Sequence, residues 1–228
     1  MPGVRKALLF LMFLACGMVV AQADERVVVG SKRFTESYIL GEIVAQTART
    51  TGVRAEHRPG LGNTAVVLEA LKAGSIDIYP EYLGTIEQEI LKLPTGSAPE
   101  TIARELARRG RAHGVPLGFS NSYALATAEA LAGQRGLRRI SDLRAQPDLR
   151  VALSQEFLGR ADGWPGLAAR YGLPQRPSAI DHGLSYAALA TARIDVTDIY
   201  TTDARIAELK LHTLQDEAHY FPRYDAVL

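Results

Sequence analysis

Four tyrosines stand at points where predicted strands end or where a loop interrupts the chain. They come from well-separated parts of the sequence and are Tyr82, Tyr123, Tyr200 and Tyr224. For any one tyrosine, half-buried packing is the ordinary role. Four tyrosines at equivalent positions predict a shared aromatic pocket. Such a pocket suits a quaternary ammonium group, which cannot donate a strong hydrogen bond but is attracted to the faces of aromatic rings.

A second group of side chains could hold an anion. Lys32 and Arg160 lie in predicted loops, and Thr85 follows the end of a predicted strand. Ammonium, guanidinium and hydroxyl groups all donate hydrogen bonds to carboxylates. Taken singly, Lys32 or Arg160 is more typical of a solvated surface charge. Together with the tyrosines, these donors predict a site for a zwitterion, with a cationic end among the rings and an anionic end near the donors.

The patterns of common enzymes and metal sites do not occur in the sequence. The five histidines are scattered, without a His-x-x-x-His or His-Glu pairing, and no Gly-x-Ser-x-Gly segment is present. Asp195, Asp198 and Asp203 are better explained as strand ends and helix caps than as a cation site. We therefore expect no catalytic residue, no metal and no cofactor. With 26 basic and 25 acidic residues, the chain also has no strong basic field for nucleic acid.

The elements that position these side chains alternate strand with helix, which predicts the α/β class. Residues 76–82 are predicted as a buried strand after an alanine-rich helix, and residues 194–200 repeat the arrangement. Ligands of open α/β sheets bind at the carboxyl ends of the strands. The repeat therefore predicts two similar lobes that each offer a tyrosine to one cleft. A strand is also predicted at residues 115–120, and a polar functional loop at residues 154–166.

The first residues of the chain have the pattern of a secretory signal peptide. A basic segment, an apolar run from Ala7 to Val20 and the small-x-small site Ala21-Gln22-Ala23 predict cleavage after residue 23. Cys16 is the only cysteine and lies inside this segment, so the mature chain is expected to have no thiol or disulfide. Lipid attachment at Cys16 is the less favoured alternative, because Phe13-Leu14-Ala15 matches a lipoprotein signal poorly. An uncleaved anchor is also less favoured.

Several segments resemble one protein family. They are Val-Val-Gly-Ser-Lys-Arg-Phe-Thr-Glu at 28–36, the Gly60–Thr64 turn, residues 76–85, residues 154–160, and Phe-Pro-Arg-Tyr-Asp at 221–225. The chain resembles, in order from about Arg26 to its last residue, the substrate-binding proteins of osmoprotectant ABC importers of the glycine betaine, carnitine and choline type. The pairing of Gly-Ser-Lys-x-Phe-Thr-Glu with Asp-x-Tyr-x-Glu-Tyr-x-Gly-Thr is specific.

The resemblance implies a periplasmic-binding-protein fold of type II, with two α/β lobes and a ligand cleft between them. Lobe 1 is expected at residues 24–119 and lobe 2 at 120–219. Residues 220–228 return towards lobe 1, where the family's chain continues, so that lobe is expected to lack part of its packing. The resemblance also implies transport through ABC permease and ATPase subunits, and a location in the periplasm. We expect the protein to be a monomer.

Site residues follow from the same motifs. The resemblance assigns a tyrosine cage for a quaternary ammonium to Tyr82, Tyr123, Tyr200 and Tyr224, and the carboxylate end to Lys32, Thr85 and Arg160. Asn121 and Glu156 match supporting positions.

Two other interpretations remain open from the sequence. A binding protein of the same fold could serve a polar amino acid, in which case an acidic side chain would meet the ammonium. Alternatively, the chain could be a sensory module or a degenerate domain that does not bind a ligand.

Overall fold

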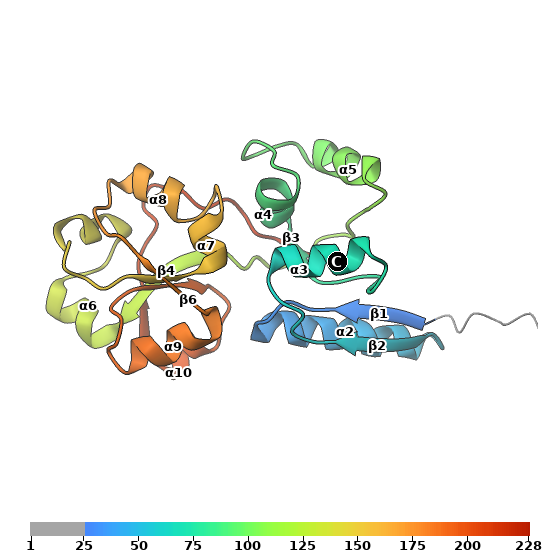
Figure 1. Cartoon of the computed structure of the whole chain (residues 1–228), viewed down its shortest axis with the longest axis horizontal. Helices are drawn as coiled ribbons and strands as arrows, with labels where there is room; N and C mark the ends of the chain where they lie inside the picture. Colours follow the sequence, from blue (N-terminus) through green and yellow to red (C-terminus); the bar gives the residue numbers. More distant parts are fainter. Residues whose placement is uncertain (1–25) are drawn as a thin grey trace, which may run out of the picture.

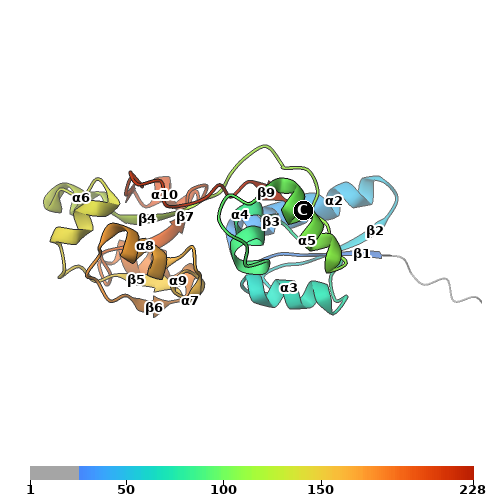
Figure 2. The same ribbon diagram turned by 90° about the horizontal axis from the view of Figure 1, so that it is seen from above.

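Two groups of elements lie side by side in the computed structural model, which describes residues 26–228 (Figure 1). The predicted signal peptide at residues 1–23, with Cys16, lies outside the described residues. One group runs from β1 to α5 and is here called lobe 1; the other runs from β4 to β8 and is called lobe 2. Two connecting segments join them, one before β4 and the other leading back to β9, which lies beside β3 (Figure 2).

Lobe 1 contains the first part of the described chain together with the last strand. Its elements are β1 (Arg26–Gly30), α2 (Thr35–Thr50), β2 (Arg54–Arg58), α3 (Thr64–Lys72), β3 (Glu81–Tyr82), α4 (Leu83–Thr85), the π-helix η1 (Ile86–Ile90), α5 (Pro99–Arg108) and β9 (Ala226–Val227). The Asn63 side chain caps α3 by accepting from the backbone N–H of Val66. An apolar cavity of about 470 Å³ lies in this lobe, between α3 and the segments around η1 and α5.

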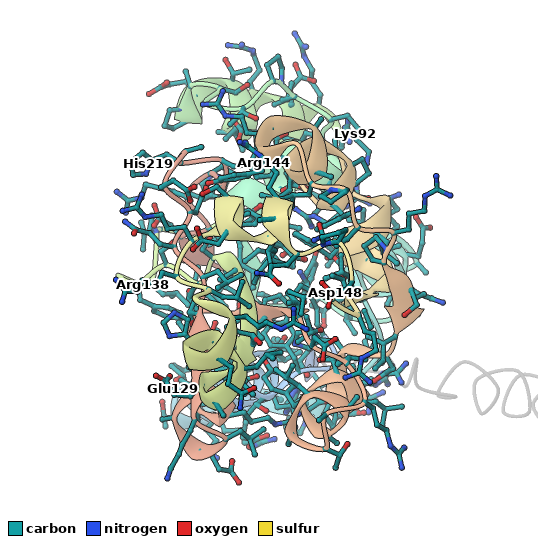
Figure 3. The ribbon with its side chains drawn as sticks, turned by 90° about the vertical axis from the view of Figure 1, so that its left-hand side faces the viewer. Lys92, Glu129, Arg138, Arg144, Asp148 and His219 are labelled. Carbon is teal, nitrogen blue, oxygen red and sulfur yellow. The ribbon has the colours of Figure 1, made fainter. Side chains whose placement is uncertain are left out.

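Lobe 2 contains the shorter and more numerous elements. They are β4 (Tyr123–Ala128), α6 (Glu129–Arg135), the 3₁₀ helix η2 (Ile140–Ala145), β5 (Ala152–Ser154), α7 (Gln155–Gly159), α8 (Trp164–Tyr171), β6 (Ser178–Ile180), α9 (His182–Ala190), β7 (Thr197–Tyr200), α10 (Arg205–Glu208) and β8 (Leu211–Thr213). The largest core cluster packs here and extends to Tyr82 and Tyr224. Seen from its outer end, charged side chains such as Glu129, Arg138 and Asp148 cover the surface of this lobe (Figure 3).

The strands of the two lobes follow the same order. In lobe 2, parallel β6 and β5 connect through the Val151–Val196 bridge to the antiparallel strands β7, β4 and β8. In lobe 1, parallel β2 and β1 connect through the Val29–Ile78 bridge to the segment that ends in β3, which pairs with antiparallel β9. The two strands that end in Tyr82 and Tyr200 are therefore equivalent.

The internal repeat seen in the sequence has the same backbone bonding in both lobes. Asp77 donates its backbone N–H to the Val28 carbonyl at 2.8 Å, and its side-chain Oδ2 accepts from the Val28 N–H at 2.7 Å. Asp195 does the same with Arg150, at 2.8 and 2.7 Å. Each aspartate therefore fixes the start of a strand that ends in a site tyrosine.

Three local predictions were wrong in extent. Residues 76–82 form a regular strand only at Glu81–Tyr82, because Pro80 has no N–H for a ladder. Residues 115–120 do not form a regular strand, since the chain bends at Gly118 with φ of 92°, although Leu117 and Phe119 bond to Ala226. The predicted loop at 154–166 contains α7 and the start of α8, since Ser154 caps α7 and Pro165 lies in the first turn of α8. No helix among residues 26–228 is long and apolar enough to span a bilayer.

Candidate functional site

Seven of the predicted site residues line one enclosed space between the lobes, together with Phe34. The seven are Lys32, Tyr82, Thr85, Asn121, Tyr123, Tyr200 and Tyr224. We call the aromatic part of this set the cage, defined as Phe34 and the four tyrosines. The ring centroid of Tyr123 lies 5.3 Å from that of Tyr200 and 5.6 Å from that of Tyr224. The structure thus brings together rings that are far apart in the sequence.

Strand pairing and hydrogen bonds position the rings. Tyr123 and Tyr200 are direct partners in the antiparallel pair of β4 and β7, so both belong to lobe 2. Tyr82 is paired with Ala226 in lobe 1. The Tyr82 hydroxyl donates to Glu36 Oε1 at 2.6 Å, and the Tyr224 hydroxyl donates to Asp162 Oδ2 at 2.6 Å.

Burial keeps the cage phenols neutral. It raises the pKa of Tyr82 and Tyr224, and the neighbouring carboxylates Glu36 and Asp162 raise it further. Burial also raises the pKa of Tyr123 and Tyr200 well above the usual value for tyrosine. A phenol that donates to a carboxylate keeps its ring rich in electron density. These ring faces therefore attract cations.

Phe34 is a cage member that the sequence analysis did not assign. Its ring centroid lies 4.7 Å from that of Tyr200 and 6.3 Å from that of Tyr82, so it bridges the lobes. Phe34 directly precedes α2, and its N–H donates to the Lys32 carbonyl in a tight turn. The only sequence signal for it was its place in the Gly-Ser-Lys-x-Phe-Thr-Glu motif.

Both predicted cationic residues are buried and already paired with carboxylates. Lys32 Nζ donates to Glu81 Oε1 at 2.5 Å, and burial raises the pKa of the Glu81 carboxyl. Arg160 donates through Nε and Nη2 to the two oxygens of Asp162, at 2.7 and 2.5 Å. Both charged groups predicted for the carboxylate end therefore already have a carboxylate partner within the protein. The other amino group, Arg160 Nη1, lies 3.4 Å from both Thr85 Oγ1 and Glu156 Oε1.

The two supporting residues lie at the boundary between the lobes. Asn121 donates to Glu36 Oε1 at 2.9 Å, which links the segment before β4 to the start of α2. Glu156 Oε1 accepts from the Thr64 hydroxyl at 2.6 Å, joining α7 of lobe 2 to α3 of lobe 1. Glu156 lines the adjoining cleft rather than the cage.

Partners of the site residues were missed because their role depends on the fold. Glu36, Glu81 and Asp162 are carboxylates that contact cage or clamp side chains. With Glu156, four acidic groups surround the site against the two cations Lys32 and Arg160. Glu36 and Asp162 lie within or beside the recognised motifs, which was the only available signal. The excess of negative charge favours a ligand with a positive group.

The space enclosed by the rings is small, at about 10 Å³. This is roughly the room that one water molecule needs. A trimethylammonium group can bind there only if the rings separate. The adjoining cleft is larger, at about 370 Å³, and shares Lys32, Phe34 and Tyr200 with the cage.

Comparisons with known proteins identify the family of the chain. Residues 25–228 match the OpuAC family, described as the substrate binding domain of an ABC-type glycine betaine transport system. The chain is 33% identical over 227 residues to a glycine-betaine-binding protein of Pseudomonas aeruginosa, covering 91% of this chain and 71% of that protein. It is 32% identical over 209 residues to an ergothioneine transport permease and binding protein, EgtU, of Helicobacter pylori, covering 89% of this chain and 38% of that protein.

A solved structure has the same arrangement of elements. The crystal structure of a glycine betaine/carnitine/choline ABC transporter protein superposes with a TM-score of 0.66 at 26% identity, covering 88% of this chain and 78% of that chain. The similarity therefore includes the fold as well as the sequence motifs.

Proposed function

The chain belongs to the family of substrate-binding domains of ABC-type glycine betaine transport systems, and we propose that it captures quaternary ammonium osmolytes in the periplasm for an importer. Its fold is the two-lobed α/β fold of type II periplasmic binding proteins. The proposed ligands are glycine betaine or choline, bound by the cage. ABC permease and ATPase subunits are the proposed partners.

The convergence of four tyrosines and Phe34 on one enclosed space carries this proposal. Each cation–π contact contributes about 0.5–2 kcal/mol, so four tyrosines supply roughly 2–8 kcal/mol. A Kd of about 1 μM corresponds to roughly 8 kcal/mol. Contacts to the anionic end add to this, whereas the loss of ligand freedom opposes it. Micromolar affinity is therefore the expected range.

The anionic end of a betaine would bind at Thr85 and Arg160. Arg160 Nη1 is the part of the guanidinium that Asp162 does not bind, and it lies 3.4 Å from both the Thr85 hydroxyl and Glu156 Oε1. Lys32 contributes positive charge from the other side, although its ammonium also binds Glu81. The ligand would thus contact both lobes.

Capture requires a hinge motion, because the cage walls come from both lobes. Tyr82 and Phe34 belong to lobe 1, whereas Tyr123 and Tyr200 belong to lobe 2. Opening at the two connecting segments would separate these rings, and closure would trap the ligand. The contacts Thr64–Glu156 and Arg33–Asp181, the latter at 3.6 Å, would form on closure.

Titration calorimetry with glycine betaine, choline and proline betaine tests the proposal. We expect heat of binding with at least one of them, at micromolar affinity. Absence of heat with all three, from a sample shown to be folded by circular dichroism, would contradict it. Binding of a polar amino acid, without binding of any betaine, would instead support the amino-acid interpretation.

A further inference from the structure

A chain of hydrogen bonds lies behind the turn that carries Lys32 and Phe34 into the cage. Ser31 Oγ is 2.9 Å from His57 Nε2, and His57 Nδ1 is 3.1 Å from Glu42 Oε2. Ser31 directly follows β1, His57 belongs to β2, and Glu42 belongs to α2. Three segments of lobe 1 therefore meet at one imidazole, next to the residue that precedes Lys32.

The imidazole and the serine are tightly enclosed. The His57 side chain is 8% exposed, and a Cβ atom at Gly41 would lie 2.5 Å from its Nε2, so the ring packs where α2 has no side chain. Ser31 is fully buried, and among residues 26–228 its hydroxyl has two hydrogen-bond partners, His57 and the Gly60 N–H at 3.4 Å. Serine, histidine and carboxylate follow in the order of a nucleophilic triad. No substrate can reach a fully buried hydroxyl, so the arrangement positions the chain instead.

The hydrogen bonds of this chain have a defined direction. Glu42 is ionised near neutral pH, because hydrogen bonds from Gln46 and two further side chains lower its pKa. A carboxylate only accepts, so His57 Nδ1 carries the hydrogen and Nε2 of the neutral ring is the acceptor. Ser31 must then donate to His57. Protonation of the ring places a hydrogen on Nε2 as well, and the buried Ser31 hydroxyl loses its acceptor.

Few charged groups face the imidazole. From α2 they are Glu42 and Arg49, and Arg49 binds the other oxygen of Glu42 at 3.2 Å. Glu56 and Arg58 are its neighbours on β2, where they point to the opposite face of the strand and bind each other. Its partner on β1, Val29, carries no charge. A proton on the imidazole therefore acts through its own two hydrogen bonds.

The Ser31 bonds hold a turn that lines the site. Leu61 donates its N–H to the Ser31 carbonyl at 3.0 Å, and Phe34 donates its N–H to the Lys32 carbonyl at 3.0 Å. The side chains of Lys32 and Phe34 both line the enclosed space of the cage. A turn that is already ordered costs less to arrange around a ligand, so these bonds favour binding as well as folding.

We propose that His57 is a positioning residue for ligand capture, whose neutral form, acting through Ser31, holds the turn at residues 32–34 in the arrangement that binds a betaine. This inference rests on the proposed function, because betaine affinity is the quantity that changes. A histidine exchanges its proton between about pH 5 and 8. Affinity should fall as the pH is lowered through this range, since the proton and the ligand favour opposite states of the ring.

Titration calorimetry with glycine betaine at about pH 8 and about pH 5 tests this inference. His57→Gln keeps a hydrogen-bond acceptor in place of Nε2 but does not titrate. As the pH is lowered, we expect the Kd of the wild type to rise about three to ten times more than that of His57→Gln, as the loss of one hydrogen bond allows. Carboxylates of the cage are the same in both proteins, so the comparison removes their contribution.

Two further variants separate positioning from a general effect on the fold. Ser31→Ala removes the hydroxyl, so its Kd should already be about threefold above that of the wild type at the higher pH and should follow the pH trend of His57→Gln. His212→Gln is the matched control, because His212 also lies beside a carboxylate, Glu129 at 3.6 Å, but on β8 and away from the cage. It should keep the wild-type trend. Circular dichroism verifies that each sample is folded.

The possible outcomes distinguish the two proposals. An equal pH trend in wild type and His57→Gln, or an unchanged affinity of Ser31→Ala, would overturn the positioning role while leaving the cage intact. Nitrogen-15 NMR of the imidazole gives a readout without any ligand, and a neutral ring with its hydrogen on Nε2 would contradict the direction of the chain. If the wild type binds no betaine at either pH, the proposed function fails and this inference fails with it.

Discussion

Lobe 1 and lobe 2 each bring to the cage an aromatic strand end and a buried ion pair, but the two ion pairs differ in how completely they are bonded. In lobe 2, the oxygens of Asp162 accept from Arg160 Nε, Arg160 Nη2 and the Tyr224 hydroxyl. In lobe 1, Glu81 Oε1 accepts from Lys32 and from the Tyr82 N–H, whereas Oε2 is buried without a partner among the described residues.

The strands that carry the cage tyrosines also differ, and the strand in lobe 2 is again the more completely bonded. Tyr200 ends a strand with four paired positions against β4, whereas Tyr82 ends one with two paired positions against β9. An apolar cavity of about 470 Å³ also reaches Glu81 and the residues near β3. Because unsatisfied atoms and open space lower the cost of rearrangement, lobe 1 is the half of the site that we expect to adjust more readily.

The largest expected effect on stability comes from removing either of the two buried carboxylates. Asp162→Ala should lower the free energy of unfolding by about 3–5 kcal/mol, because it leaves the buried Arg160 charge with only the longer contact to Glu156, at 3.4 Å. Glu81→Ala should cost about 1–3 kcal/mol, since the loss of the Lys32 pair is offset by removal of an unsatisfied oxygen. Urea titrations of both variants measure the difference. A larger loss for Glu81→Ala would reverse the order of the lobes.

Cage rings from opposite lobes should contribute similarly to binding in spite of this difference. Tyr82→Ala and Tyr200→Ala should each raise the Kd for glycine betaine about tenfold, because each loses one ring face. Tyr171→Ala is the matched control, since Tyr171 is buried like Tyr82 but packs in lobe 2 away from the cage. Its Kd in folded material should change less than about twofold. An effect confined to one lobe would show that the ammonium binds to that lobe alone.

Equivalent turns in the two lobes carry different residues, so each residue can be replaced by the one found in the other lobe. Gly74 and Ala192 occupy matching positions after α3 and α9, with φ of 66° and 53°. Gly74→Ala should lower the free energy of unfolding by about 1 kcal/mol, and Ala192→Gly should raise it by less than about 1 kcal/mol, because the left-handed conformation is unfavourable for alanine. Thermal unfolding of the two variants measures both effects. If the changes have the same sign, the turns are not equivalent.

The smallest expected effect is a pH dependence of stability, which comes from the Glu81 carboxyl of lobe 1. Burial raises its folded-state pKa above the unfolded value, so its contribution to stability is fully present below its ordinary pKa and is lost as the pH rises through the folded-state pKa. The stability of wild type relative to Glu81→Gln should therefore be greatest near about pH 4 and should decrease as the pH rises. Urea unfolding between about pH 4 and 8 measures this trend. A difference that grows with pH would show that the Lys32 charge dominates the pair.

The sequence predicted much of the fold and named the four tyrosines that lie together, because strand ends and motifs are local patterns. The alanine-rich pattern predicted α3, and the repeated arrangement at residues 76–82 and 194–200 predicted two equivalent strands. The pairing of Lys32 with Glu81 was not predictable, because it depends on strands brought together only by folding.

The missed features share this dependence on distant parts of the chain. In the sequence, Phe34 is only a residue that precedes a helix. Its place in the cage depends on Tyr200, which belongs to the other lobe and packs against it. Residues 154–166 have the glycine and polar composition of a loop, yet the Ser154 cap allows α7 to form. Composition describes a segment, whereas its neighbours decide the conformation that it adopts.

The narrow space among the cage rings has a consequence for the speed of binding. At about 10 Å³, it admits no osmolyte until Phe34 and the tyrosines move apart. A ligand that encounters the closed form must therefore wait for a motion that does not depend on ligand concentration. In rapid-mixing experiments, the observed association rate should rise with concentration and then reach a plateau, whose value is the opening rate of the protein itself.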